Sequence, residues 1–89
     1  MQVHKLKILI EAGGVGEVTV SYDANADGWT VQVRYTTRSG ERIEALERQR
    51  GGARVFATLE AVASCLFGCG GESFRVINPR SSEGSSDDR

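Results

Sequence analysis

The sequence predicts an α+β fold: an antiparallel sheet of four to five strands with one helix packed on one face, in the order β-β-β-β-α-β. Residues 29–37 alternate between apolar and polar side chains, which is typical of a strand with one wet face. Residues 59–67 instead repeat their apolar side chains at helical spacing. Glycine, asparagine and aspartate separate the remaining apolar runs, as they do in turns between strands.

The helix is predicted to begin after Thr58 and to end at Gly68. The Thr58 hydroxyl can accept a hydrogen bond from a free N–H of the first turn, and Glu60 places an anion at the positive end of the helix dipole. Gly68 stands where the left-handed residue that ends a helix is expected. Residues 74–77 then predict the last strand. The apolar stripe of the helix comprises Leu59, Val62, Ala63, Leu66 and Phe67.

The N-terminal residues 3–11 predict the first strand. Gly13, Gly14 and Gly16 follow it and could suggest a phosphate-binding loop, but such a loop requires a helix after it. Residues 17–22 alternate instead, so the glycines are interpreted as a hairpin turn. The core-facing side chains of the first strand are predicted to be Leu6, Ile8 and Ile10.

Residues 41–49 are ambiguous. Ile43 with Ala45 fits a strand, whereas Ile43 with Leu46 fits one helical turn. A short turn joins this segment to a strong preceding strand, which favours the strand. One helix is roughly 10 Å wide, while five strands span roughly 24 Å. One helix therefore cannot cover the whole face that carries Trp29, Val31, Val33 and Tyr35. The part that it misses is predicted to curl over, to be covered by loops or to pack on another copy of the protein.

The segment Asp23–Gly28 resembles the opening of a calcium loop, with oxygen ligands at the first, third and fifth positions and glycine at the sixth. The twelfth position should be a glutamate and is Arg34. Aspartate, asparagine and glycine are also the usual residues of a turn between strands. A turn is therefore predicted, and weak calcium binding by it is left open.

Composition predicts one domain over residues 1–79. The chain has 89 residues and a net charge of −1, so its overall charge does not favour nucleic acid or anionic lipid. No apolar run is long enough to span a membrane. Residues 80–89 have no apolar side chain and predict a disordered acidic tail. Two cysteines without an export signal predict a cytoplasmic protein with reduced thiols.

Catalytic residues, a metal site, a cofactor and a small-molecule substrate are not predicted, so the protein is expected not to be an enzyme. His4 is the only histidine and has no partner of its kind. Cys65 and Cys69 lie one helical turn apart without further strong ligands nearby, so they are interpreted as packing residues.

The arginines suggest a partner. Between Arg34 and Arg54 there are six arginines and three glutamates, and arginine suits phosphate groups and stacking on bases. The leading hypothesis is therefore a non-enzymatic accessory or regulatory domain that binds nucleic acid through an arginine-rich loop and an open sheet face. The alternative is a protein-interaction module that homodimerises through its uncovered sheet face. The predicted nucleic-acid-binding residues are Gln32, Arg34, Thr36, Arg48, Arg50 and Arg54.

The run Val55-Phe56-Ala57-Thr58-Leu59-Glu60-Ala61, the helix that ends at Gly68, and Phe74-Arg75-Val76 resemble small accessory proteins of bacterial plasmids and other mobile elements. The resemblance covers about the last third of the ordered chain. It implies a bacterial accessory role and transfers no site residues.

Overall fold

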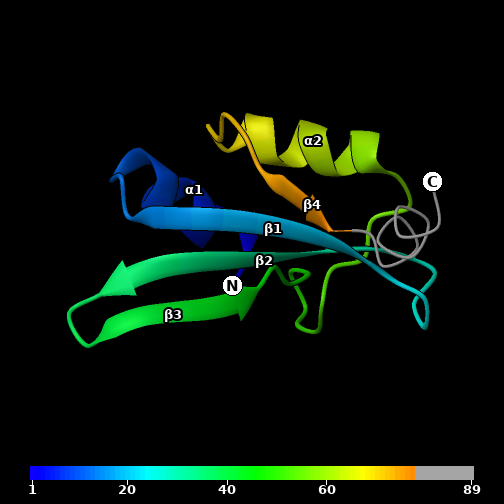
Figure 1. The fold of residues 1–89 in the computed structure, drawn as a ribbon, viewed down its shortest axis with the longest axis horizontal. Coiled ribbons are helices and arrows are strands. Elements are labelled where there is room, and N and C mark those ends of the chain that lie inside the picture. The colour runs from blue at the N-terminus through cyan, green and yellow to red at the C-terminus, as the bar shows by residue number, and fades with distance from the viewer. Residues whose placement is uncertain (78–89) are drawn as a thin grey trace, which may run out of the picture.

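The computed structural model describes residues 1–77. The predicted tail, residues 80–89, lies outside the described residues. The elements follow in the order α1 (Val3–Glu11), β1 (Val15–Asp23), β2 (Gly28–Thr37), β3 (Gly40–Ala45), α2 (Leu59–Gly68) and β4 (Arg75–Ile77) (Figure 1). None of the described helices is both long enough and apolar enough to cross a membrane.

The sheet has four strands in the order β3-β2-β1-β4. β1 pairs with β2 and β2 with β3 in antiparallel directions, while β4 runs parallel to β1. The predicted α+β class is confirmed, but a purely antiparallel sheet and the order β-β-β-β-α-β are wrong. β4 is parallel because α2 carries the chain back to the starting end of β1, as crossover helices do.

The predicted N-terminal strand is also wrong, because residues 3–11 form α1. Leu6 is fully buried, whereas Ile8 is 51% exposed. In a strand these two side chains would share a face, but in a helix they point about 200° apart. Val3 and Ile10, which are partly buried, lie at helical spacing from Leu6 and pack against the same core.

The core lies between one face of the sheet and the helices. Val31 and Val33 are fully buried and Tyr35 is 5% exposed, so at these residues the face is covered from within the chain. α2 packs on the face, and α1 adds Leu6 to the same buried cluster, which one helix alone could not complete. Burying these apolar side chains stabilises the fold by about 25 cal/mol per Å². Trp29 at the end of the face stays half-buried.

The predicted helix is confirmed as α2. The Thr58 hydroxyl accepts a hydrogen bond from the Ala61 N–H at 3.1 Å. Phe67 departs from the predicted stripe, because it is 52% exposed and its ring lies 6.0 Å from that of Phe74. Gly68 is the last helical residue, and Gly70, with φ +98°, supplies the left-handed conformation expected at Gly68.

Residues 41–49, which fitted either a strand or a helical turn, are a strand only as far as Ala45. β3 ends at Ala45, and the chain then leaves the sheet before rejoining β2 at Phe56. Phe56 and Trp29 exchange two main-chain hydrogen bonds of 2.7 and 2.8 Å. Residues 47–53 therefore form a loop at the sheet edge, named here the edge loop, with the buried Leu46 and Phe56 on either side of it.

Candidate functional site: a basic groove

The structure divides the six residues of the predicted nucleic-acid site between two places. Gln32, Arg34 and Thr36 belong to β2 and alternate with the buried Val31, Val33 and Tyr35, so they lie on the face of the sheet away from the core. This second face, which no described helix packs on, is named here the bare face. Arg48, Arg50 and Arg54 lie in or beside the edge loop, and Arg54 contacts the core residue Phe56.

On the bare face, Arg34 is already paired. Its Nη2 donates a 3.0 Å hydrogen bond to Oε1 of Glu17 on β1, the residue opposite Arg34 in the register. The other oxygen of Glu17 lies 3.7 Å from Nη1 of Arg75 on β4. A phosphate group at Arg34 would therefore have to compete with a carboxylate. Gln32 and Thr36 are exposed and uncharged.

Two of the remaining three arginines contribute to a groove between the start of α1 and the edge loop, named here the basic groove. It encloses about 610 Å³. His4 and Lys7 line its α1 side, one helical turn apart and therefore on the same face of the helix. Arg48 and Arg54 line it from the loop side, while Arg50 is exposed and does not line it.

Main-chain hydrogen bonds fix the shape of the edge loop. Arg48 N–H donates to the Gly52 carbonyl at 3.0 Å, and Gly51 N–H donates back to the Arg48 carbonyl at 2.9 Å. Gly51 and Gly52 have φ of +94° and +79°, the left-handed region in which glycine is least strained. Arg54 N–H donates to the Leu46 carbonyl at 2.9 Å, which closes the loop.

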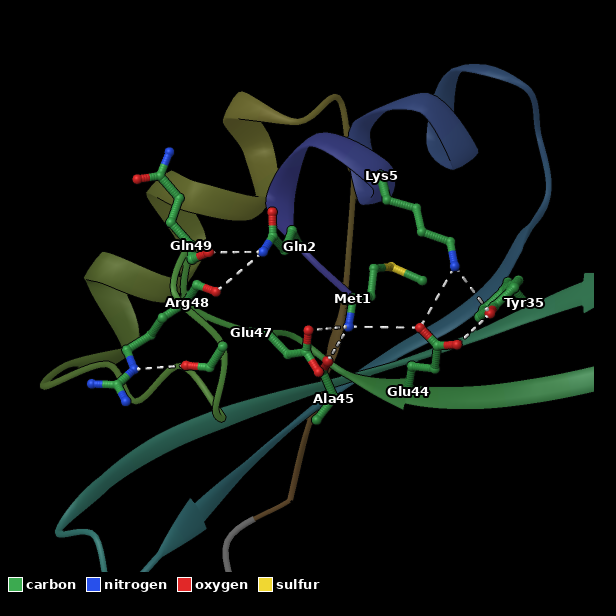
Figure 2. A network of polar contacts seen from close by, with 10 residues as sticks. Met1, Gln2, Lys5, Tyr35, Glu44, Ala45, Glu47, Arg48 and Gln49 are labelled. Atoms are coloured by element: carbon green, nitrogen blue, oxygen red, sulfur yellow. Dashed lines mark hydrogen bonds and ion pairs between the residues drawn. The ribbon is translucent and has the colours of Figure 1, made fainter.

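The first residues of the chain fasten the edge loop to α1. Figure 2 shows the Gln2 side chain reaching the loop, where its Nε2 donates to the carbonyls of Gln49 at 3.0 Å and Arg48 at 3.5 Å. Glu47 N–H also donates to the Met1 carbonyl at 2.7 Å. The two walls of the basic groove are therefore tied together at its base.

The two arginines are held in different ways. The Arg54 guanidinium lies 4.8 Å from the centre of the buried Phe56 ring, a cation–π contact that orients its charge. Nε of Arg48 donates to the Gly51 carbonyl at 3.3 Å. The Arg48 side chain is otherwise exposed at the groove, so its terminal nitrogens can reach a bound anion.

Among residues 1–77, Glu47 is the only acidic side chain that lines the basic groove, and its charge is already neutralised by a neighbouring cation. Its Oε1 lies 3.3 Å from the Met1 ammonium group, which also donates to the Ala45 carbonyl at 2.8 Å. The same ammonium lies 3.6 Å from Glu44 (Figure 2). With Glu47 paired in this way, Lys7, Arg48 and Arg54 give the groove a net positive charge.

The start of α1 adds to this positive field. Gln2 is the N-cap residue but makes no side-chain cap, because its amide is used on the edge loop, and no acidic residue lies in the first turn. The first N–H groups of α1 therefore lack a capping acceptor from Gln2. Val3 and His4 bring this end of the helix to the groove, where the helix dipole favours an anion.

Sequence reasoning missed the α1 side of this site. His4 and Lys7 were placed on a strand, where a spacing of three puts side chains on opposite faces. Recognising Val3, Leu6 and Ile10 as a helical stripe would have placed His4 and Lys7 together, but no sequence signal relates α1 to the edge loop.

The segment Asp23–Gly28 is a turn. Oδ1 of Asp23 accepts hydrogen bonds from the N–H groups of Asn25 and Ala26, at 3.0 and 3.4 Å. Asp27 accepts a 2.5 Å hydrogen bond from the Tyr22 hydroxyl. Within residues 1–77, no group of three or more histidine, cysteine, aspartate or glutamate side chains is arranged to hold a metal ion.

The two cysteines are unpaired thiols. Cys69 is buried beside the core, and burial raises the pKa of its thiol. A thiol with a raised pKa is a poor nucleophile at neutral pH.

The chain matches no protein-family model, no curated protein and no solved structure.

Proposed function

We propose that the protein is a non-enzymatic accessory or regulatory domain that binds nucleic acid, and that the basic groove holds the phosphate groups. The observation that carries this proposal is the convergence of Lys7, Arg48 and Arg54, from two separate segments, on one groove. The one acidic side chain that lines it within the described part of the chain is already paired. Arginine forks match the geometry of phosphate oxygens. The bare face is not included in this proposal, because the Arg34 side chain already forms an ion pair with Glu17.

The groove favours contacts to the phosphate backbone over contacts to bases. Among residues 1–77, no phenylalanine, tyrosine or tryptophan lines it, and the nearby Phe56 ring is buried beneath Arg54. The groove therefore lacks the large aromatic platforms that hold stacked bases, and phosphate contacts carry no sequence information. We expect binding that varies little between sequences and weakens steeply as salt is added.

The proposal is tested with labelled single-stranded and duplex oligonucleotides at several salt concentrations. Replacing Lys7 and Arg48 with alanine should weaken binding and flatten the slope of log affinity against log salt. The expected change is roughly 0.7 per lost contact for single strands and roughly 0.9 for duplex. Both side chains are exposed, so the fold should survive the double substitution.

The matched control is the double change of Arg38 and Arg42 to alanine. Both are exposed arginines of the β2–β3 hairpin, and neither lines the basic groove. This variant loses the same net charge, so it should bind almost as well as the unchanged protein. Equal weakening in both variants would reduce the effect to overall charge, and no binding at low salt would remove nucleic acid as the partner.

The second candidate function, homodimerisation, now concerns the bare face. Ile43 and Ile77 are 64% and 45% exposed and belong to the two edge strands. Their register partners Arg34 and Ser21 place both on the bare face. Sedimentation of the protein and of Ile43→Asp would test it: a concentration-dependent dimer that the substitution abolishes would favour this function, and a monomer at all concentrations would remove it.

A further inference from the structure

A second groove lies at the other end of α1, between the turn that leads into β1 and the segment that joins α2 to β4. It encloses about 560 Å³ and is named here the β1-edge groove. Ile10, Val18 and Phe74 provide apolar side chains to it. It does not share a lining residue with the basic groove.

The β1-edge groove runs along a part of β1 that has no neighbour on one side. β4 is only three residues long, and its pairing with β1 begins at Thr19 opposite Arg75. β1 itself begins four residues earlier, at Val15. Among the described residues, no strand pairs with Val15–Val18 on the side where β4 lies.

The register shows which main-chain groups point to this open side. Trp29 exchanges hydrogen bonds with Phe56, and the Val31 carbonyl accepts from Leu46, so odd-numbered residues of β2 direct their main-chain groups away from β1. In an antiparallel pair, the residues opposite them on β1 direct their main-chain groups away from β2. These residues are Val18, opposite Val33, and Val20, opposite Val31. The Val18 N–H is therefore directed toward the groove, one step before β4 begins, while the Val18 carbonyl faces the first residue of β4.

The walls of the groove leave room for another main chain. Gly13 and Gly16 line it on the β1 side, and Gly70 and Gly71 line it on the α2 side. Glycine on a strand marks places where another backbone approaches closely, because no side chain intervenes. Gly16 is the one of the four that lies on a strand, and Gly13, Gly70 and Gly71 add main chain without side chains from the adjoining turns.

The rim of the groove carries one carboxylate that is not neutralised. Glu72 is exposed and makes no ion pair with any residue of the described chain. In Glu17, by contrast, one carboxylate oxygen pairs with Arg34 and the other with Arg75. A basic side chain bound at this rim would pair with Glu72 without displacing an existing contact.

We propose that the β1-edge groove binds an extended peptide segment of a partner protein, which adds as a short strand beside Val15–Val18. The peptide would place small apolar side chains against Val18 and Phe74 and a lysine or arginine beside Glu72. Main-chain hydrogen bonds give such strand addition its affinity, and the side chains give its selectivity. This inference is independent of nucleic-acid binding, because it concerns a different groove, in which a carboxylate rather than a cluster of basic side chains meets the ligand.

The test uses the capped peptide Ac-Lys-Val-Thr-Val-Lys-NH2 and an amide NMR titration of the whole chain. We expect shifts confined to the groove, at Gly16, Val18, Gly70 and Gly71. The same peptide with N-methyl groups on alternate amides keeps its side chains but loses the donors, so its affinity should fall at least roughly tenfold. Exchanging both lysines for glutamate should weaken binding similarly.

Variants of the protein locate the site independently. Glu72→Lys should abolish the preference for the lysine peptide, while the matched control Glu41→Lys, at an exposed position on β3, should keep it. Ser73→Tyr should fill the groove, with Ser64→Tyr on the exposed side of α2 as its control. The proposal is overturned by shifts centred elsewhere, by equal binding of the N-methylated peptide, or by no shift at peptide concentrations on the order of millimolar.

Discussion

The Tyr35 hydroxyl donates a 2.6 Å hydrogen bond to Oε2 of Glu44. The two residues lie on adjacent strands, and Glu44 is also approached by two ammonium groups, those of Lys5 at 3.7 Å and Met1 at 3.6 Å. The hydrogen bond from Tyr35, followed by the charges of Lys5 and Met1, lowers the pKa of Glu44 below its ordinary value of 4.5. This carboxylate therefore joins β3 to β2, α1 and the first residue of the chain.

The first prediction is that Tyr35→Phe destabilises the protein in a pH-dependent way. Because the pKa of Glu44 is lowered on folding, its contribution is fully present above pH 4.5 and is lost as pH falls through the folded pKa. The loss at neutral pH should be about 1 kcal/mol, because Glu44 is partly exposed. Urea unfolding at pH 7 and at pH 3 measures it. A difference between the two proteins that is as large at pH 3 would contradict this assignment.

The second prediction separates a helix from a strand at residues 3–11. Leu6→Ala should cost about 2–5 kcal/mol, because Leu6 is fully buried in the core. Ile8→Ala removes a side chain that is 51% exposed and should cost far less. Thermal unfolding of both variants provides the comparison. Similar losses at the two positions would indicate that they share a buried face, as in a strand.

The third prediction concerns the start of α2. Thr58→Ala removes the hydroxyl that accepts from Ala61 N–H and should cost about 1 kcal/mol. Ser64→Ala, at an exposed position inside the same helix, should be neutral or slightly stabilising, since alanine is the better helix former. Unfolding midpoints that move equally for both would show that the cap is not formed in solution.

The fourth prediction compares two glycines. Gly52 has φ +79°, and a Cβ there would lie 3.2 Å from Nη2 of Arg48, so Gly52→Ala should cost about 1 kcal/mol and disturb the basic groove. Gly68→Ala meets no atom within 4 Å at a helical position and should stabilise the fold by roughly 0.5–1 kcal/mol. Unfolding measurements should give opposite signs, and only Gly52→Ala should alter oligonucleotide binding.

The elements that sequence could predict are those with one unambiguous period. The strand at Gly28–Thr37 and the helix at Leu59–Gly68 each have a single period and appear where expected. Residues 3–11 carry so many apolar side chains that both periods fit, and only packing against the core selects the helix. The direction of β4 could not be predicted, because three residues carry no information about which neighbour they will join.

Only those parts of the candidate site that are formed by residues close together in the sequence could be predicted. The edge-loop arginines were identified from composition, but Arg34 could not be known to pair with Glu17, because that contact depends on the register between β1 and β2. The contribution of Lys7 depends on α1 lying beside the edge loop. Contacts of this kind arise from tertiary structure and leave no local pattern.

The parallel pairing of β4 with β1 also bears on the order in which the protein folds. The antiparallel strands β1, β2 and β3 are joined by short turns, so they can associate early at little cost in loop-closure entropy. Thr19 pairs with Arg75, which lies far along the chain, so closing this loop costs more entropy than closing either hairpin. Amide protons of β4 should therefore be the first in the sheet to exchange with deuterium in the native state. The pairing of β4 with β1 should also be the last step of refolding and should limit its rate.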